Sequence, residues 1–312
     1  MMMTASVLKW LGPTPLSRRK ALWGMALVAP NVLGLMFFFG IPVLMAFGTS
    51  FNEWNAIKPP RFVGLDNFER LLYEDSFEQA LTNTLKLLGL VVPAEVLLAL
   101  GVAMLLNLPL HGRGVLRTIY FLPVVTSTVA ASVVWTGIFQ PRYGILSQVL
   151  EPFGLGETKW LVEPGLVLIP IAVVAVWQRL GFDMVIFLAG LQTIPSVLYE
   201  AALIDGAGRW QRFRHVTLPM LSPTTFLVIV LAVINSFQIF DQVYVMTLRT
   251  VPGGVGGSAT TLTYYLYRRA FTNSEFGYAS AVALVLFGVI LLVTIFQLAI
   301  QRYWVYYESE EG

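Results

Sequence analysis

The chain has 312 residues, of which 56% are hydrophobic and only 12% are charged, and its mean hydropathy is +0.71. Soluble globular domains carry about 25% charged residues, so this composition excludes a water-soluble domain and indicates that lipid is the main solvent. The net charge of +2 gives no reason to expect nucleic acid as a partner, and the lack of cysteine excludes disulfides, cysteine-ligated zinc and thiol catalysis.

Six apolar stretches are each long enough to cross a bilayer, because about 20 residues at a rise of 1.5 Å cover its hydrocarbon core. The sequence therefore predicts an all-α polytopic membrane protein with about six transmembrane helices. We number these stretches as spans one to six: 22–47, 81–106, 116–139, 165–190, 223–247 and 276–300.

Basic residues before span one predict the sidedness of the chain. Lys9, Arg18, Arg19 and Lys20 precede the first apolar run, and such residues gather on the cytoplasmic side. A twin-arginine signal peptide is disfavoured, because the run is too long and no small-residue cleavage site follows it. We therefore expect three segments: a cytoplasmic tail over 1–20, one transmembrane domain over 21–300 and a second cytoplasmic tail over 301–312.

A polar segment at about 193–222 separates spans four and five. It predicts two short helices, with a start at Ser196 after Pro195, a break at Gly206 and a stop at Pro219. Apolar residues including Trp210 share one side of these helices, which is also typical of an amphipathic helix lying on the bilayer. The physical pattern alone leaves a docking segment and an interfacial helix equally open.

This segment resembles the EAA loop of binding-protein-dependent ABC importer permeases. The family pattern is E-A-A, three residues, Gly, about nine residues, an aliphatic residue, one further residue and L-P. The resemblance implies two short cytoplasmic coupling helices that dock onto an ATPase subunit. The matching positions, which it assigns to this coupling, are Glu200, Ala201, Ala202, Asp205, Gly206, Ala207, Phe213, Leu218 and Pro219.

Further matches indicate the carbohydrate-uptake branch of this family, with its MalF-like and UgpA-like members. The run at 63–68 is similar to F-V-G-L-x-N-F, and 240–247 is similar to F-D-x-V-Y-V-L-T at the end of span five. Departures are the residues at 248–250, where the family usually has Gly-Gly, and the absence of a large periplasmic insert. The solute, a sugar or a polyol such as glycerol phosphate, therefore stays open.

The resemblance also implies the partners of the chain. They are a second permease subunit, two ATPase subunits, an extracytoplasmic solute-binding protein and the lipid bilayer of the bacterial cytoplasmic membrane, with no nucleic acid. ATP and Mg are expected in the ATPase partners and no cofactor on this chain, which lacks a G-x-x-x-x-G-K-[ST] loop. The chain is accordingly not expected to be an enzyme.

Polar side chains inside span four are candidates for the wall of a substrate path. Gln178, Arg179 and Asp183 lie within it, and the latter two are four residues apart on one helix face. A lone charge in mid-membrane costs at least ~2.5–3.5 kcal/mol, and pairing lowers this cost. The pair is either a structural ion pair or part of a translocation cavity.

Span five carries a second polar set. Asn235, Gln238 and Gln242 are spaced to form one helical stripe, with Asp241 and Tyr244 beside it. Amides both donate and accept hydrogen bonds, which suits sugar hydroxyl groups. Interhelical hydrogen bonding, worth about 0.6 kcal/mol on average, explains the same stripe without a substrate. Weaker candidates for the path are Glu95 in span two and Trp135 in span three.

The leading interpretation is the permease subunit of an ATP-driven importer for a sugar or polyol. The alternative is an ion- or proton-coupled secondary transporter or channel that uses the ionisable groups Glu95, Arg179, Asp183 and Asp241. Secondary transporters usually contain internal repeats, and the sequence contains none that we detect. The only two histidines, His111 and His215, fall in predicted loops, which disfavours an intramembrane protease and a histidine metal site.

Overall fold

The computed structural model describes residues 15–109 and 111–306. The regular secondary structure of its described part is helical apart from one antiparallel hairpin, formed by β1 (Asn52–Glu53) and β2 (Arg61–Phe62). Parts of the two expected tails, 1–14 with Lys9 and 307–312, lie outside the described residues. The expectation of an all-helical membrane protein is confirmed, with four helices long and apolar enough to cross a bilayer, or up to six spans if two bent helix pairs each count as one.

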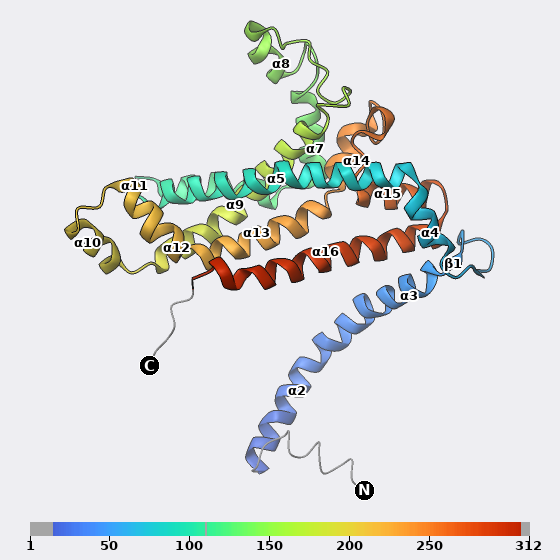
Figure 1. The fold of residues 1–312 in the computed structure, drawn as a ribbon, viewed down its shortest axis with the longest axis horizontal. Helices are drawn as coiled ribbons and strands as arrows, with labels where there is room; N and C mark the ends of the chain where they lie inside the picture. Colours follow the sequence, from blue (N-terminus) through green and yellow to red (C-terminus); the bar gives the residue numbers. More distant parts are fainter. Residues whose placement is uncertain (1–14, 110, 307–312) are drawn as a thin grey trace.

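The long helices correspond to spans one, two, four and six. Span one is a continuous helical segment that includes a π-helical turn, η1 (Met36–Gly40), and nothing in its most apolar window is buried. In Figure 1 it diverges from the other long helices, which run side by side. The helices of these four spans are α2 (Pro15–Leu35) with α3 (Ile41–Ser50), α5 (Asp75–Asn107), α9 (Leu168–Thr193) and α16 (Phe276–Trp304).

Span three is bent, where the sequence predicted one helix over 116–139. It consists of α6 (Arg113–Phe121), η2 (Leu122–Val125) and α7 (Thr128–Ile138), with a bend of 101°. Thr126 is extended, and the Ser127 side chain caps α7 by accepting a bond from the Ala130 amide. A new helix therefore starts at Thr128, and Figure 1 shows α7 and α8 (Ile145–Leu150) projecting away from the bundle; η3 (Glu151–Phe153) follows α8.

Span five is also broken, and the predicted single helix over 223–247 is wrong. Helix α13 (Ser222–Phe237) ends before Gln238, and α14 (Asp241–Leu248) begins after Phe240. The last carbonyls of a helix need outside donors. Thr263 Oγ1 donates to the Phe237 carbonyl at 2.8 Å, and Thr261 Oγ1 donates to the Ile239 carbonyl at 3.1 Å. These hydroxyls, far along the chain, stabilise the break.

Short helices close the two ends of the bundle. The segment between α9 and α13 contains α10 (Ser196–Ile204), α11 (Arg209–Arg212), η4 (Phe213–Thr217) and α12 (Leu218–Met220). Figure 1 shows it at the end of the bundle opposite to β1 and α4. Near the latter end lie α4 (Asp66–Tyr73), η5 (Val255–Gly257), α15 (Leu262–Tyr267) and η6 (Arg268–Thr272).

Close packing fixes α9 at the centre. Its side chains meet α5 in clusters that include the fully buried Leu87, Ile171 and Val174. Gly181 on α9 touches α6 so closely that an added Cβ would collide with the backbone of Tyr120 and Phe121. The central helix therefore carries both α5 and the first half of span three.

Ion pairs tie the helices together at the end near the hairpin. Glu74, before α5, pairs with Arg269 of η6 and accepts a hydrogen bond of 2.8 Å from Tyr278 of α16. Arg70 Nη1 lies 3.0 Å from Glu275 Oε1. Burial, together with a hydrogen bond to Tyr278, raises the pKa of Tyr265 well above its usual range. This network holds the ends of spans two and six in one position.

Candidate functional site

A polar cavity of about 420 Å³ lies between α5, α9 and the two helix breaks. It is formed where span three changes direction and where span five is interrupted, so the non-helical backbone at both breaks lies beside this hollow. Its lining residues are Val91, Glu95, Val124, Thr128, Ala175, Gln178, Arg179, Asn235, Ser236, Gln238, Ile239, Phe240, Asp241 and Gln242.

Four of the predicted span-five residues line this cavity, although not as one stripe. Asn235 is on α13, Gln238 follows the end of that helix, and Asp241 and Gln242 begin α14. The break, rather than a helical period, brings them together. Tyr244 instead packs in an aromatic cluster, with its ring centroid 5.5 Å from those of Phe240 and Tyr267.

Gln178 of α9 connects both breaks. Its Nε2 donates to the Thr126 carbonyl at 3.2 Å and to Thr128 Oγ1 at 2.9 Å, across the bend of span three. Its Oε1 accepts a bond of 3.4 Å from Gln242 Nε2, beyond the break of span five. One amide on the continuous helix thus holds the two discontinuous ones.

Charged side chains gather behind and beside Gln178. The predicted contact between Arg179 and Asp183 is present, with Nη2 to Oδ1 at 3.8 Å. Arg179 lines the cavity and its guanidinium stacks over the Phe182 ring at 5.0 Å, whereas Asp183 is fully buried outside the lining. Within the described residues, neither oxygen of Asp183 has a hydrogen-bond partner.

Glu95 of α5 is an ionisable residue beside this pair. It is 1% exposed, it lines the cavity, and its Oε2 has no hydrogen-bond partner among the described residues. It lies close enough to Asp183 and Arg179 to interact with both charges. The sequence signal was an acid inside an apolar span. Ser236 is a further polar residue of span five, whereas Thr128 was missed, because a small hydroxyl residue in an apolar run carries no such signal.

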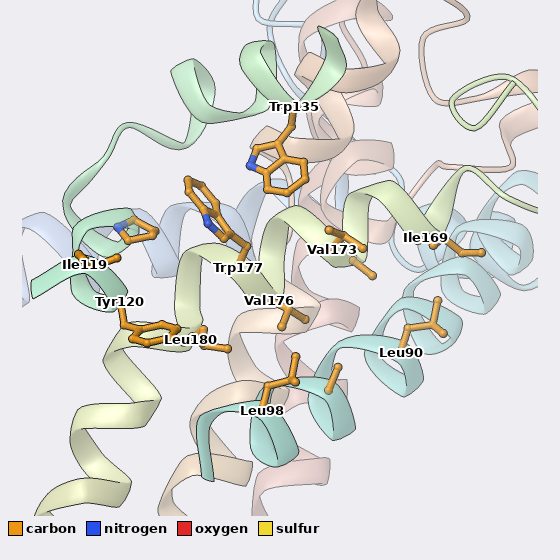
Figure 2. A pocket seen from close by; sticks show the side chains of 13 residues that line it. Leu90, Leu98, Ile119, Tyr120, Trp135, Ile169, Val173, Val176, Trp177 and Leu180 are labelled. Atoms are coloured by element: carbon orange, nitrogen blue, oxygen red, sulfur yellow. The ribbon is translucent and has the colours of Figure 1, made fainter. Parts of the chain in front are cut away.

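A second, apolar pocket of about 600 Å³ lies on the other side of α9 (Figure 2). Figure 2 shows the indole rings of Trp135 and Trp177 close together beside it, and their centroids are 5.5 Å apart. Leu90 and Leu98 of α5 contribute to its opposite wall. Trp135, a weaker candidate for the path, therefore belongs to this apolar surface and not to the polar cavity.

The segment predicted to couple to an ATPase forms two short helices around a tight turn. Glu200, Ala201 and Ala202 lie in α10, and Asp205 ends it. Gly206 has φ of +76°, and the amides of Gly206 and Ala207 bond to the carbonyls of Leu203 and Ala202 at 3.0 and 2.8 Å. This is a Schellman motif, which favours glycine because the left-handed conformation strains other residues.

The outer side of this turn is an apolar surface without cover. Leu203 and Val197 are exposed, and Ile204 and Trp210 are 87% and 68% exposed. Phe213 lies in η4, and Leu218 and Pro219 lie in α12. His215 also lies in η4, so the expectation that it falls in a loop is wrong. Large exposed apolar patches mark interaction sites. We call Val197, Leu203, Ile204 and Trp210 the end surface.

Comparison with known proteins agrees with this architecture. Residues 87–304 match the family model described as binding-protein-dependent transport system inner membrane component. The chain is 35% identical over 300 residues to the probable ABC transporter permease protein YesP of Bacillus subtilis, covering 94% of this chain and 95% of the relative. It is 33% identical to the trehalose/maltose transport system permease protein MalF of Thermococcus litoralis, covering 92% and 96%.

Solved structures extend the agreement to the fold. A bacterial ABC transporter that imports the acidic polysaccharide alginate superposes with a TM-score of 0.76 at 26% identity, covering 91% of this chain and 96% of the other. A second structure of an alginate transporter, bound to a pentasaccharide-loaded periplasmic protein, gives 0.74 at 25% identity, again covering 91% and 96%.

Fold, cavity and matches together define a multi-pass permease of the inner membrane. The chain belongs to the family of binding-protein-dependent transport system inner membrane components and is a permease subunit of an ATP-driven ABC importer. As such a subunit it is not the catalytic component of the transporter. Within the described residues, no group of three or more His, Asp or Glu side chains is placed to hold a metal ion.

Proposed function

We propose that this permease translocates a sugar or polyol through the polar cavity. The observation that carries the proposal is the convergence of Asn235, Gln238, Asp241 and Gln242 with Gln178 and Arg179 around one hollow inside the spanning bundle. Amides and carboxylates match hydroxyl groups, and Asp183 supports this wall by pairing with Arg179. A relative named for trehalose and maltose transport supports the solute class.

The working assembly contains a second permease, two ATPase subunits and an extracytoplasmic solute-binding protein. The alginate transporter solved with its periplasmic protein supports the last partner. ATP and Mg are bound by the ATPase subunits, and this chain binds no cofactor. The assembly lies in a bacterial cytoplasmic membrane, with a permease domain over 21–300 and cytoplasmic tails over 1–20 and 301–312.

Coupling takes place at about 193–222, where α10, α11 and α12 lie at one end of the bundle. The end surface supplies exposed apolar area onto which an ATPase subunit can dock. A helix that only lay on the bilayer would not need the exposed turn at Gly206 that interrupts this surface. Glu200 and Asp205 flank this surface as charged residues, and Gly206 sets the angle between α10 and α11.

Reconstituted vesicles test the transport function. The purified assembly, with internal ATP and external binding protein, is given radiolabelled trehalose, maltotriose and arabinotriose. We expect uptake of at least one sugar that requires ATP and persists when ionophores collapse the ion gradients. Uptake driven by an ion gradient without ATP would instead establish secondary transport through Glu95, Arg179, Asp183 and Asp241.

Gly206→Arg tests the coupling role. The substitution places a side chain at φ of +76° and in the proposed ATPase interface, so we expect insertion into the membrane to persist while uptake and ATP hydrolysis become uncoupled. Gly112→Arg is a matched control, because Gly112 has φ of +75° with open space around it, as Gly206 does. Normal coupled uptake in the Gly206 variant would refute docking at this turn.

A further inference from the structure

Two neighbouring pockets form one groove along α5 and α9 that changes from polar to apolar along its length. The polar part, of about 670 Å³, lies at the end of the bundle near the hairpin, and its lining includes Lys86 and Leu168. The apolar part is the pocket of about 600 Å³ beside Trp177, and it begins one helical turn further along α5 at Leu90 and one residue further along α9 at Ile169. Because residues four apart lie above one another on a helix, both parts follow the same helix faces. We call them together the α5–α9 groove.

The polar part of the α5–α9 groove carries charges of both signs. Lys86 is the only cation among its lining residues, which are all described, and Glu78 and Asp75 lie about two to three turns nearer the start of α5. No ion pair in the described part of the chain involves any of these three side chains. The hydroxyl of Ser258 is buried in the same wall and has no hydrogen-bond partner among the described residues. This part therefore offers a cation, two carboxylates and an unused hydroxyl to a ligand.

The apolar part has about the depth of one lipid leaflet. Its lining on α9 extends from Ile169 to Leu180, a rise of about 17 Å, whereas the hydrocarbon of one leaflet is about 15 Å deep. Ile119 and Trp135, which lie on either side of the bend in span three, both contribute to it, and Figure 2 shows Leu98 of α5 on the other side of α9. Leu98 and Ile119 are exposed. Only hydrocarbon or another helix can fill a hollow of this kind at membrane depth.

We propose that the α5–α9 groove binds a phospholipid with an amine headgroup, of the phosphatidylethanolamine class. The acyl chain fills the apolar part, the phosphate contacts Lys86, and the ammonium group meets Glu78 and Asp75. Hydrocarbon, phosphate and amine follow one another in this order in the lipid, and the matching side chains follow one another in the same order along α5. A helix from another subunit would fill the apolar part but leave these charges unpaired, so the change in polarity favours the lipid.

The bound chain supports the bend in span three. It contacts Ile119 before the bend and Trp135 after it, and it occupies the angle that a straight helix would have filled. The site lies in the leaflet at the hairpin end, which is the outer one under the proposed sidedness. It is separate from the polar cavity on the other side of α9, so this inference does not depend on the solute that is transported.

Photo-crosslinking locates the lipid. The purified assembly is placed in phosphatidylcholine nanodiscs that contain a small fraction of phosphatidylethanolamine with a diazirine on its acyl chain. After irradiation, the crosslinked peptides are identified by mass spectrometry. We expect labelling within 86–98 and 169–180 that excess unlabelled phosphatidylethanolamine reduces several-fold. Phosphatidylglycerol, which has the phosphate but no amine, should compete less well.

Two variants separate the headgroup contact from the chain contact. Lys86→Gln should reduce the labelling several-fold, whereas Lys58→Gln, exposed between β1 and β2, should not change it. Ala94→Phe fills the apolar part and should abolish labelling there, whereas Ala299→Phe, exposed on α16, should leave it unchanged. Phosphatidylethanolamine added to the delipidated assembly should also raise its Tm more than phosphatidylglycerol does.

Three results would overturn the proposal. Equal labelling by phosphatidylcholine and phosphatidylethanolamine probes would mean that only ordinary bilayer lipid touches the groove. Equal competition by phosphatidylglycerol would remove the selection for an amine by Glu78 and Asp75. Absence of labelling from the groove of the assembled transporter would show that another subunit covers it. The competition uses the unaltered chain, so it decides the question even if a variant does not assemble.

Discussion

The continuous helix α9 and the interrupted spans three and five meet around one cavity but have opposite construction. α9 runs through 26 residues without a break and is packed on most sides by α5, α6 and α13. Span three bends by 101°, and span five stops and restarts around Gln238. The continuous helix fixes the positions of its neighbours, whereas the interrupted spans provide the polar backbone, the side chains and the volume of the cavity.

This difference shows how a polar site is accommodated inside lipid. Carbonyls released by the break in span five are satisfied by the threonines at 261 and 263, and the bend in span three is held by Gln178. These backbone carbonyls therefore find partners within the protein, because unsatisfied backbone in hydrocarbon costs several kcal/mol. Substitutions that disturb α9 should thus damage assembly, and substitutions at the breaks should mainly alter the cavity.

The largest expected effect comes from Gly181→Ala, which attacks the continuous helix. The added methyl group collides with the backbone of Tyr120 and Phe121, where no flexible side chain can yield. Overpacking of this kind costs about 1–3 kcal/mol or more, so we expect a lower Tm and poor assembly. Gly101→Ala on α5 is the control, since nothing lies within 4 Å of its added Cβ. Equal Tm values for the two variants would show that α6 moves freely on α9.

A double-mutant cycle on Arg179 and Asp183 tests the charge pair on the same helix. Removing one partner of an ion pair leaves the other charge unpaired, and the cost is smaller than for a fully buried pair because the Arg179 side chain is 31% exposed. Asp183 is fully buried, so Arg179→Gln alone should lower Tm more than the combined change with Asp183→Asn. Strictly additive losses would mean that each residue depends on a different partner.

Gln178→Leu distinguishes a role of Gln178 in the stability of the bundle from a role in shaping the cavity. The variant removes the bonds to Thr126, Thr128 and Gln242 and leaves buried groups unsatisfied, at about 1–3 kcal/mol. We expect a moderate loss of Tm. In the Gln238→Cys background we also expect the introduced thiol to react at a different rate with a polar thiol reagent. Gln148→Leu, whose single bond lies on the projecting arm, provides the comparison. A changed Tm with unaltered reactivity would limit Gln178 to a structural role.

The smallest effect should follow Thr263→Val, which removes one hydroxyl from the break in span five. Its bond to the Phe237 carbonyl is worth about 1 kcal/mol, so assembly should persist with a slightly lower Tm and reduced uptake. Thr294→Val is the matched control, because Thr294 bonds only to a carbonyl of its own helix, four residues earlier. Similar losses in both variants would mean that Thr263 does not specifically stabilise the break.

Most of the framework could be predicted from the sequence. Spans one, two, four and six follow from hydropathy, and Pro195, Gly206 and Pro219 predicted the two short helices between α9 and α13. These features depend on local composition and turn chemistry. Gly206 in particular has the left-handed conformation that its position in the pattern suggested.

The breaks could not be predicted in this way, because their stabilising contacts are distant in sequence. Thr263 lies 26 residues after Phe237, and Gln178 lies 52 residues after Thr126. Hydropathy treats Gln238 as one polar residue in an apolar run. The expected stripe on span five thus identified cavity residues but gave the wrong reason for their proximity. Glu95 lines the cavity because α5 packs against α9, a contact that the sequence alone does not show.

The length of α13 has a consequence for the membrane that surrounds the protein. Its 16 residues rise about 24 Å, less than the ~30 Å of a typical hydrocarbon core. α9, with 26 residues, rises about 39 Å and accommodates a thicker bilayer by reducing its tilt. Lipids with longer acyl chains thicken the hydrocarbon layer while the length of α13 stays the same. The acyl-chain length therefore adjusts how deep the polar cavity at the end of α13 lies in the hydrocarbon core.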